Sequence, residues 1–228
     1  MLGSTRGGAK FGAYFVRMSM VKCASVASKL DKKIMLTLQV GVQTISLGRP
    51  LKTALLTAAK LGADAVEIDA RTELRGEVQS QTAIRQFRKM LEDLNLSLAA
   101  LAYPTRHGYD TIDRLEARIA GTKEAMQLAS ALGAPVVVNQ IGHVPSAVDV
   151  EEDEHERKRW NCLCDVLSDL GHFGDRQGAL LAAETGNEPG SCLAELIQSI
   201  SAGSIAVTLN PGNLILGGFT PLEAISEL

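Results

Sequence analysis

Short apolar runs alternate with longer amphipathic segments along most of the chain. The apolar runs predict strands at residues 34–45, 65–69, 96–102, 135–139, 179–183 and 205–209. The longer segments have helical spacing and predict helices at residues 51–61, 81–94, 111–132, 151–170, 191–201 and 221–228. Several of these helices stop at a glycine, such as Gly62 or Gly133, and an apolar run follows at once. Strands that alternate with helices predict a parallel sheet with right-handed crossovers.

Six such units predict an incomplete parallel (β/α) barrel of the TIM type. A closed barrel of eight units usually takes about 250 residues, whereas residues 34–228 leave room for six units of about 30 residues each. We therefore expect one barrel domain over residues 34–228 that ends two units early. An open doubly wound parallel sheet is the alternative, because six strands curled into part of a barrel leave two unpaired edges.

Residues 1–33 differ from the rest of the chain. Glycines and basic residues are scattered through them without a clear period, which predicts a flexible N-terminal extension. A secretory signal is disfavoured, because Arg17 and Lys22 interrupt the apolar patch that such a signal needs.

The composition of the chain argues against several classes of binding partner. The net charge of −3 and the aromatic content of 4% argue against a nucleic-acid surface. No apolar run approaches the roughly 18 residues of a membrane span. The four cysteines form no C-x-x-C pair, so reduced thiols in a cytoplasmic protein are expected rather than a zinc site or a disulfide framework.

Two of the predicted strands end on a polar residue where a turn begins. Glu184 follows the apolar run at 179–183, and Asn210 follows the run at 205–209. In a parallel barrel the carboxyl ends of the strands meet at one mouth, where the loops close around a ligand. A carboxylate there is costly to bury unless it binds a metal, a cation or a proton. Glu184 is therefore the first candidate for catalysis, and pairing with an arginine is the alternative.

Other polar residues lie at or just after the ends of predicted strands and are candidates for substrate binding. They are Glu67, Arg106, His107, Asn139, His143 and Asn213. Arg106 either holds a phosphate or carboxylate through two parallel hydrogen bonds or is a solvated loop residue. Glu67 shares a strand face with Asp69, and the two are either site groups or partners of Arg71. The phrase Asn210-Pro-Gly-Asn213 either binds ligand hydroxyls or forms a turn.

The order and spacing of four short sequence motifs resemble those of the xylose isomerase-like sugar phosphate isomerases and epimerases. Gly41-Val-Gln-Thr is similar to the opening of the first strand in that family, and the segment from Gly62 to Glu67 is similar to its second strand. Ala182-Ala-Glu184 resembles the fifth-strand glutamate, and Leu209-Asn210-Pro-Gly-Asn213 resembles the sixth-strand phrase. The resemblance covers residues 33–228 and implies a TIM barrel.

The resemblance implies a divalent metal, Mn²⁺, Mg²⁺, Co²⁺ or Zn²⁺, held by side chains from four strands. Such a metal polarises the carbonyl and hydroxyl of an open-chain sugar while two glutamates move a proton at the adjacent carbon. Glu184 matches one metal ligand and one of these glutamates. Asn210 stands where the family has an aspartate, and an amide offers a metal its oxygen but no charge. The family's seventh- and eighth-strand ligands have no counterpart in this sequence, so only one of four ligands is intact and tight metal binding is not expected from this chain alone.

Three functions follow from these observations. The first is a sugar or sugar-phosphate isomerase or epimerase, impaired if the ligand set is incomplete. The second is a non-catalytic barrel that binds a sugar-like ligand or a partner, including a second copy of the chain in a homo-oligomer. The third is an apurinic endonuclease of the type-IV family, whose three-metal chemistry needs many histidines, whereas this chain has four.

Overall fold

The computed structural model describes residues 14–17, 39–75, 78, 80–186 and 188–228. The strands are β1 (Tyr14–Arg17), β2 (Gln39–Gln43), β3 (Ala65–Asp69), β4 (Ser97–Ala102), β5 (Val136–Asn139), β6 (Leu180–Glu184) and β7 (Ala206–Thr208). The helices are α1 (Leu51–Lys60), α2 (Gln81–Asp93), α3 (Leu115–Leu132), α4 (Ala147–Glu152), α5 (Glu154–Gln177), α6 (Gly190–Gln198), α7 (Pro211–Leu216) and α8 (Pro221–Glu227), with a 3₁₀ turn, η1 (Thr44–Leu47). The extension predicted over residues 1–33 lies outside the described residues, apart from β1.

The strands form one sheet whose spatial order follows the order of the sequence, from β1 to β7. Strands β2 to β7 pair in parallel, and β1 pairs antiparallel with β2. A doubly wound sheet needs a point where the strand order reverses, and this sheet has none within the described residues. The six parallel strands curl into a half-barrel, which confirms the predicted incomplete TIM-type barrel and excludes the doubly wound alternative.

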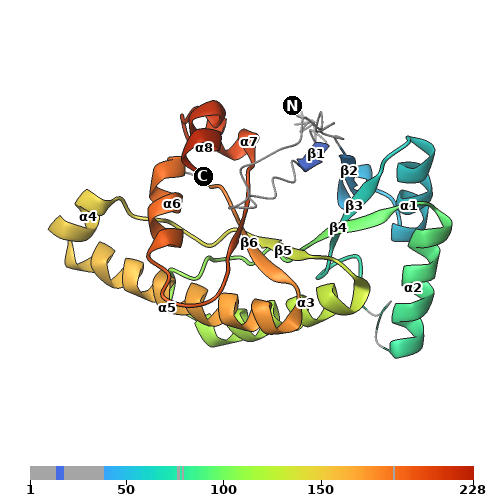
Figure 1. Ribbon diagram of the computed structural model, residues 1–228, viewed down its shortest axis with the longest axis horizontal. Coiled ribbons are helices and arrows are strands. Elements are labelled where there is room, and N and C mark those ends of the chain that lie inside the picture. The colour runs from blue at the N-terminus through green and yellow to red at the C-terminus, as the bar shows by residue number, and fades with distance from the viewer. Residues whose placement is uncertain (1–13, 18–38, 76–77, 79, 187) are drawn as a thin grey trace, which may run out of the picture.

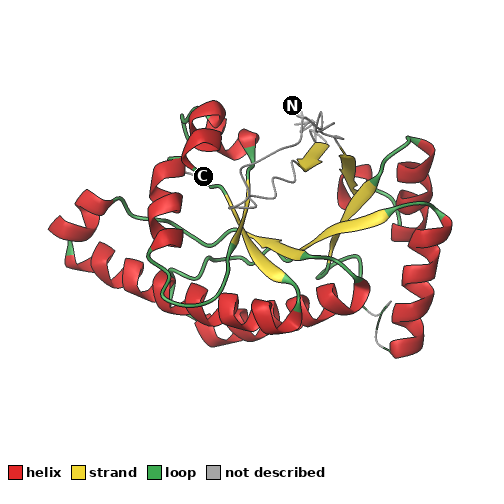
Figure 2. Ribbon diagram, in the orientation of Figure 1, coloured by secondary structure: helices red, strands yellow, loops and turns green. Residues whose placement is uncertain are grey.

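The helices cover the convex side of the curled sheet. Figure 1 shows α1 and α2 beside one end of the sheet, α3 and α5 below it and α6 beside the other end, and Figure 2 shows the strands enclosed on these three sides. The main core lies between these two layers. There the outward strand residues Ile68, Leu101 and Leu181 pack with residues such as Met126 and Leu167 of the helices. This packing holds the strand ends in a fixed arrangement.

The concave side of the sheet carries small apolar residues and the candidate carboxylates. Ala100, Val138 and Ala182 form a separate buried cluster on this side. Because successive side chains of a strand point to opposite faces, Glu184 shares the concave face with Ala182, two residues before it. In β3 the residues Val66 and Ile68 pack in the main core, so Glu67 between them points to the concave face as well.

Side-chain caps explain where the helices differ from the prediction. A single helix is predicted over residues 151–170, whereas α4 and α5 are separated at Asp153. The side chains of Ser146 and Asp149 form a reciprocal capping box that starts α4. Asp153 is extended and accepts a hydrogen bond from the backbone N–H of His155, which starts a new helix.

The helix predicted from residue 111 begins four residues later, at Leu115. Arg114 has a left-handed backbone with φ 53°, which stops a regular helix from extending toward the N-terminus. The guanidinium of Arg118 donates to the backbone oxygens of Thr111 and Asp113 and holds this loop in place. Helix α3 is therefore preceded by a non-helical loop that the Arg118 side chain contacts.

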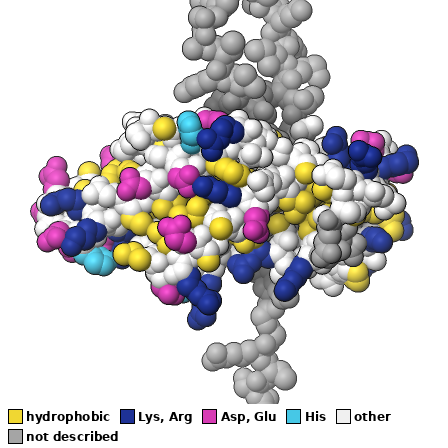
Figure 3. Space-filling model, turned by 90° about the horizontal axis from the view of Figure 1, so that it is seen from below, with side chains coloured by type: hydrophobic (Ala, Val, Ile, Leu, Met, Phe, Trp, Pro, Cys, Tyr) yellow, Lys and Arg dark blue, Asp and Glu magenta, His cyan; other side chains and the backbone are white. Residues whose placement is uncertain are grey.

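The face below the sheet carries charges of both signs. Figure 3 shows hydrophobic side chains in a band across the middle of this face, with Lys and Arg interspersed among Asp and Glu around it. Within the described part of the chain, no helix combines the length and the apolar character that crossing a membrane requires.

Candidate functional site

Glu67 is a buried carboxyl group on the concave face of the sheet. Its side chain is 5% exposed, and its Oε1 accepts a hydrogen bond of 2.7 Å from Nε2 of Gln43 on the neighbouring strand. Its Oε2 is buried without a hydrogen-bond partner among the described residues. Burial raises the pKa of Glu67 to about 7, and the charges of Glu184 and Asp69 raise it further against the hydrogen bond from Gln43. This carboxyl group is therefore partly protonated at neutral pH.

Two carboxylates accept hydrogen bonds around the end of β3, the strand that carries Glu67. Oδ1 of Asp69 accepts from the backbone N–H groups of Arg71 and Thr72, so this carboxylate shapes the turn after the strand. Oε2 of Glu73 accepts from the hydroxyl of Thr44 and from the backbone N–H of Asp69. Of the two alternatives predicted for Asp69, the structure shows a partner of Arg71, but through the backbone of that residue.

Glu184 lies at the end of β6 and contacts the loop after β7. Its Oε1 accepts a hydrogen bond of 2.9 Å from Nδ2 of Asn210. Oδ1 of Asn210 accepts from the backbone N–H of Asn213, which makes Asn210 the N-cap of α7. Nδ2 of Asn213 donates to the backbone oxygen of Thr185. The segment predicted as either a ligand loop or a turn is thus the start of a short helix, and its cap orients the Glu184 carboxylate.

Glu67 of β3 and Glu184 of β6 therefore share the concave face, and Asn210, in the loop after β7, contacts Glu184. The charge of Glu184 acts on the pKa of Glu67, and Asn210 contacts Glu184 directly. The predicted pairing of Glu184 with an arginine is not found among the described residues, where an amide takes that place.

Asn139 lies on the other face of the sheet. Its Nδ2 donates to the hydroxyls of Tyr109 and Thr105, each at 3.0 Å. The Tyr109 hydroxyl is also 2.7 Å from the hydroxyl of Thr122 on α3, and the Tyr109 side chain is fully buried in the main core. Asn139 therefore links β5 to α3 and to the loop after β4, on the side away from Glu184.

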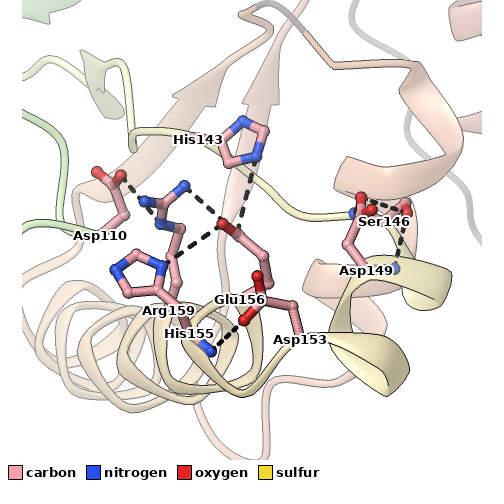
Figure 4. Close-up of polar contacts among 8 residues, drawn as sticks. All are labelled: Asp110, His143, Ser146, Asp149, Asp153, His155, Glu156 and Arg159. Carbon is pink, nitrogen blue, oxygen red and sulfur yellow. Dashed lines mark hydrogen bonds and ion pairs between the residues drawn. The ribbon is translucent and has the colours of Figure 1, made fainter.

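His143 follows β5 and faces helix α5. Its Nε2 lies 3.9 Å from Oε2 of Glu156, which is also 3.3 Å from Nη1 of Arg159. Nε of Arg159 lies 3.7 Å from Oδ2 of Asp110 in the loop after β4. Figure 4 shows these side chains converging above the first turns of α5, with His155 beside Glu156. This group ties two rim loops to α5, and in these contacts His143 faces Glu156.

Arg106 and His107 line a hollow of about 310 Å³ at the rim, next to the first turn of α3. The hollow lies on the loops that follow β3 and β4. The hollow thus lies at the carboxyl ends of the strands, as Glu67 does. It is on the helix-covered side of the sheet, whereas Glu67 is on the concave side.

The described residues do not make a complete divalent-metal site. No group of three or more His, Cys, Asp or Glu residues among them is placed to share one ion. The amide oxygen of Asn210 already caps α7, and its Nδ2 faces Glu184. An N–H group directed at a carboxylate stabilises the charge that a metal would otherwise stabilise.

Two site residues were not predicted, and each had a signal in the sequence. Gln43 ends β2 and lies level with Glu67 across the parallel pair, and a polar residue at the end of a barrel strand is such a signal. The hydroxyl of Thr185 accepts from the backbone N–H of Asn210 at 2.8 Å and lies under the loop after β7. It follows Glu184 directly, so its position at the strand end could have indicated this role.

Comparisons with known proteins agree with this architecture. The family model described as "Xylose isomerase-like TIM barrel" matches residues 55–226. The structure is similar to a xylose isomerase domain protein from Planctomyces limnophilus, with 20% identity, a TM-score of 0.62, and coverage of 76% of this chain and 64% of that one. It is also similar to a D-psicose 3-epimerase, with 14% identity, a TM-score of 0.63, and coverage of 81% of this chain and 65% of that one.

A third similar structure is a sugar phosphate isomerase/epimerase from Parabacteroides distasonis ATCC 8503. Its identity is 17% and its TM-score 0.59, with coverage of 82% of this chain and 70% of that chain. The chain thus spans slightly less than two thirds of the length of the first two structures. A search of curated protein sequences finds no match.

Proposed function

Because this chain belongs to the family of xylose isomerase-like TIM barrels, we propose that it is an isomerase or epimerase of sugars or sugar phosphates. The reaction is the transfer of a proton at the carbon next to the carbonyl of an open-chain sugar. The observation that carries this proposal is the pair of glutamates on the concave face, where burial and then the charge of Glu184 raise the pKa of Glu67. Two carboxyl groups whose environments differ are the groups that such a proton transfer needs.

In the proposed mechanism Glu184 is the base. Its carboxylate takes the proton from the carbon, and the electrons of the C–H bond move toward the carbonyl oxygen to give an enediolate. Asn210 holds Oε1 of Glu184, so Oε2 is the oxygen that faces the substrate. Glu67 returns a proton, either to the opposite face of the same carbon or to the neighbouring carbon. Its pKa of about 7 suits this role, because an acid is most effective when its pKa is near the working pH.

The metal-assisted form of this reaction needs more ligands than the described residues provide. In that form the metal would stabilise negative charge on the substrate oxygens. Glu184 remains the candidate ligand, and Asn210 the weaker one. The proposal therefore predicts that added Mn²⁺ changes the rate less than the loss of the Glu184 carboxylate does.

The experiment is the exchange of the substrate proton with deuterium, followed by NMR in D₂O. The chain is incubated with D-psicose, D-fructose, L-ribulose and their phosphates, with and without Mn²⁺. We expect deuterium at the carbon next to the carbonyl, and Glu184→Gln should slow its incorporation by at least about 100-fold. Glu195→Gln is the matched control, because Glu195 is exposed on α6. Equal rates for the wild type and Glu184→Gln would remove Glu184 from the mechanism.

The second candidate is a barrel that binds a sugar-like ligand without converting it. Asn210 supports this candidate, because its amide is fully engaged by Glu184 and by α7. A ligand that binds only the folded chain raises its melting temperature. A sugar that raises it without metal and shows no deuterium incorporation would favour this function over the first one.

The proposal includes a homo-oligomer and a cytoplasmic location. Leu216, Leu222 and Ile225 of α7 and α8 are 86%, 76% and 52% exposed, and exposed apolar residues that are close together favour association. Sedimentation at several protein concentrations tests the oligomer.

The cytoplasmic location rests on the cysteines. Cys162, Cys164 and Cys192 are free, as expected for a reducing compartment, and cell fractionation tests the location.

A further inference from the structure

The hollow beside α3 gathers positive charge in a chain whose net charge is −3. Its lining includes Arg71, Arg106, Arg114 and Arg118, together with His107 and the single carboxylate Asp113. We refer to it as the arginine hollow. Among the described residues none of the four arginines has a salt bridge to a carboxylate. Four guanidinium groups around about 310 Å³ repel one another unless an anion lies between them.

Two of the arginines are held in position by the backbone. Nη1 of Arg71 donates to the oxygen of Pro104 at 2.7 Å, and its guanidinium lies 5.4 Å from the centre of the Tyr103 ring. Arg118 donates to two backbone oxygens of the loop, and its Nε is buried without a hydrogen-bond partner. These arginines are therefore oriented before any ligand arrives, which lowers the cost of binding.

The other two arginines are free to move onto a ligand. Arg106 and Arg114 are exposed, and neither side chain makes a hydrogen bond or an ion pair within the described part of the chain. Arg114 also occupies the N-cap position of α3, where no side chain accepts from the first N–H groups. An 18-residue helix with an uncapped N-terminus adds its positive dipole end to the charge of the hollow.

We propose that the arginine hollow binds a phosphate group, and that this group belongs to the substrate. The second part rests on the proposed function. Guanidinium groups pair with phosphate oxygens through parallel hydrogen bonds, and a dianion balances the net charge of the hollow better than a single carboxylate does. Arg71 lies two residues after Asp69, whose Oδ1 accepts from its backbone N–H. The hollow therefore begins at the end of the strand that carries Glu67.

The experiment is calorimetric titration with inorganic phosphate at pH 7 and low salt, which needs no turnover. We expect the wild type to bind phosphate, and the double variant Arg106→Gln/Arg114→Gln to bind it at least tenfold more weakly, at about tenfold per charged hydrogen bond lost. Both positions are exposed, so the variant should fold like the wild type. Arg88→Gln on α2 is the matched control, since Arg88 is exposed and outside the hollow.

Equal phosphate affinity in the wild type and the double variant, or no binding to the wild type, would overturn the inference. Phosphate binding that the double variant loses, without conversion of any sugar, would support the hollow while the proposed isomerase function fails. If sugars are converted, the double variant should raise the KM for a sugar phosphate and leave the KM for the unphosphorylated sugar unchanged. An equal effect on both sugars would show that the phosphate is not part of the substrate.

Discussion

Replacement of Glu67 by Gln should make the chain more stable at neutral pH and leave it unchanged in acid. Glu67 is buried, with 5% of the residue exposed. Burial first, and then the charges of Glu184 and Asp69, raise its pKa from 4.5 to about 7 in the folded chain. In the unfolded chain the group ionises at its ordinary pKa. Between these two values the unfolded chain loses its proton and the folded chain keeps it, so stability falls as the pH rises.

The size of the effect follows from the shift of the pKa. Each unit is worth about 1.4 kcal/mol, so the free energy of unfolding should fall by about 3 kcal/mol between pH 4.5 and pH 7 because of this group. Above pH 7 the group is ionised in both states and its contribution is constant. In Glu67→Gln the pH-dependent contribution of this group to the free energy of unfolding is absent. The amide oxygen can still accept the hydrogen bond that Gln43 donates to Oε1.

Urea unfolding at several pH values between 4.5 and 8 measures the difference between the variant and the wild type. We expect the two to match near pH 4.5 and the variant to be more stable by about 3 kcal/mol at pH 8. Glu92→Gln on the exposed face of α2 is the control and should follow the wild type at every pH. A variant that is less stable than the wild type at pH 8, with the same pH dependence, would refute the burial of an ionisable group at this position.

Three further results are expected. Gly108→Ala should destabilise the fold by about 3 kcal/mol in urea unfolding, because the new Cβ would lie 2.1 Å from Cα of Gly142; a change below about 0.5 kcal/mol would contradict this close approach. Tyr109→Phe should cost about 1–3 kcal/mol in the same assay, because it removes the buried hydroxyl that hydrogen-bonds with both Asn139 and Thr122, and an unchanged midpoint would argue against that network. Addition of about 1 mM Mn²⁺ should raise the melting temperature by less than about 1 °C, since a weakly bound ligand adds little stability, whereas a large rise would show a complete metal site.

Most of the fold could be predicted from the pattern of apolar residues. The bounds of β3 agree with the prediction to the residue, because Val66 and Ile68 alternate with polar residues and turn signals stand on both sides. The end of α3 also agrees, since Gly133 has a φ of 87° that few other residues adopt. The barrel-type sheet was predicted from the repetition of one βα unit, and the unreversed strand order excludes the doubly wound alternative.

The site was harder to predict, for a reason that Asn139 illustrates. It ends a run of three valines, and such a run has no alternation that tells the concave face from the helix-covered face. Only the hydrogen bonds to Tyr109 and Thr105 assign it to the helix side. For Glu184 the sequence does indicate the face of the sheet, because the small residue Ala182 lies two positions before it on the same face. The arginine hollow combines residues of two loops and α3, and no local pattern predicts that Arg71 and Arg118 lie together.

The proposed proton transfer requires Glu67 and Glu184 to lie close together on the concave face. Carbon-13 NMR of the Glu67 carboxyl group as a function of pH tests it directly in the wild type and in Glu184→Gln. The account predicts a pKa of about 7 in the wild type and a lower value in the variant, because the charge of Glu184 is removed while the burial of Glu67 remains. An ordinary pKa of Glu67 in the wild type, or the same raised value in both proteins, would contradict it.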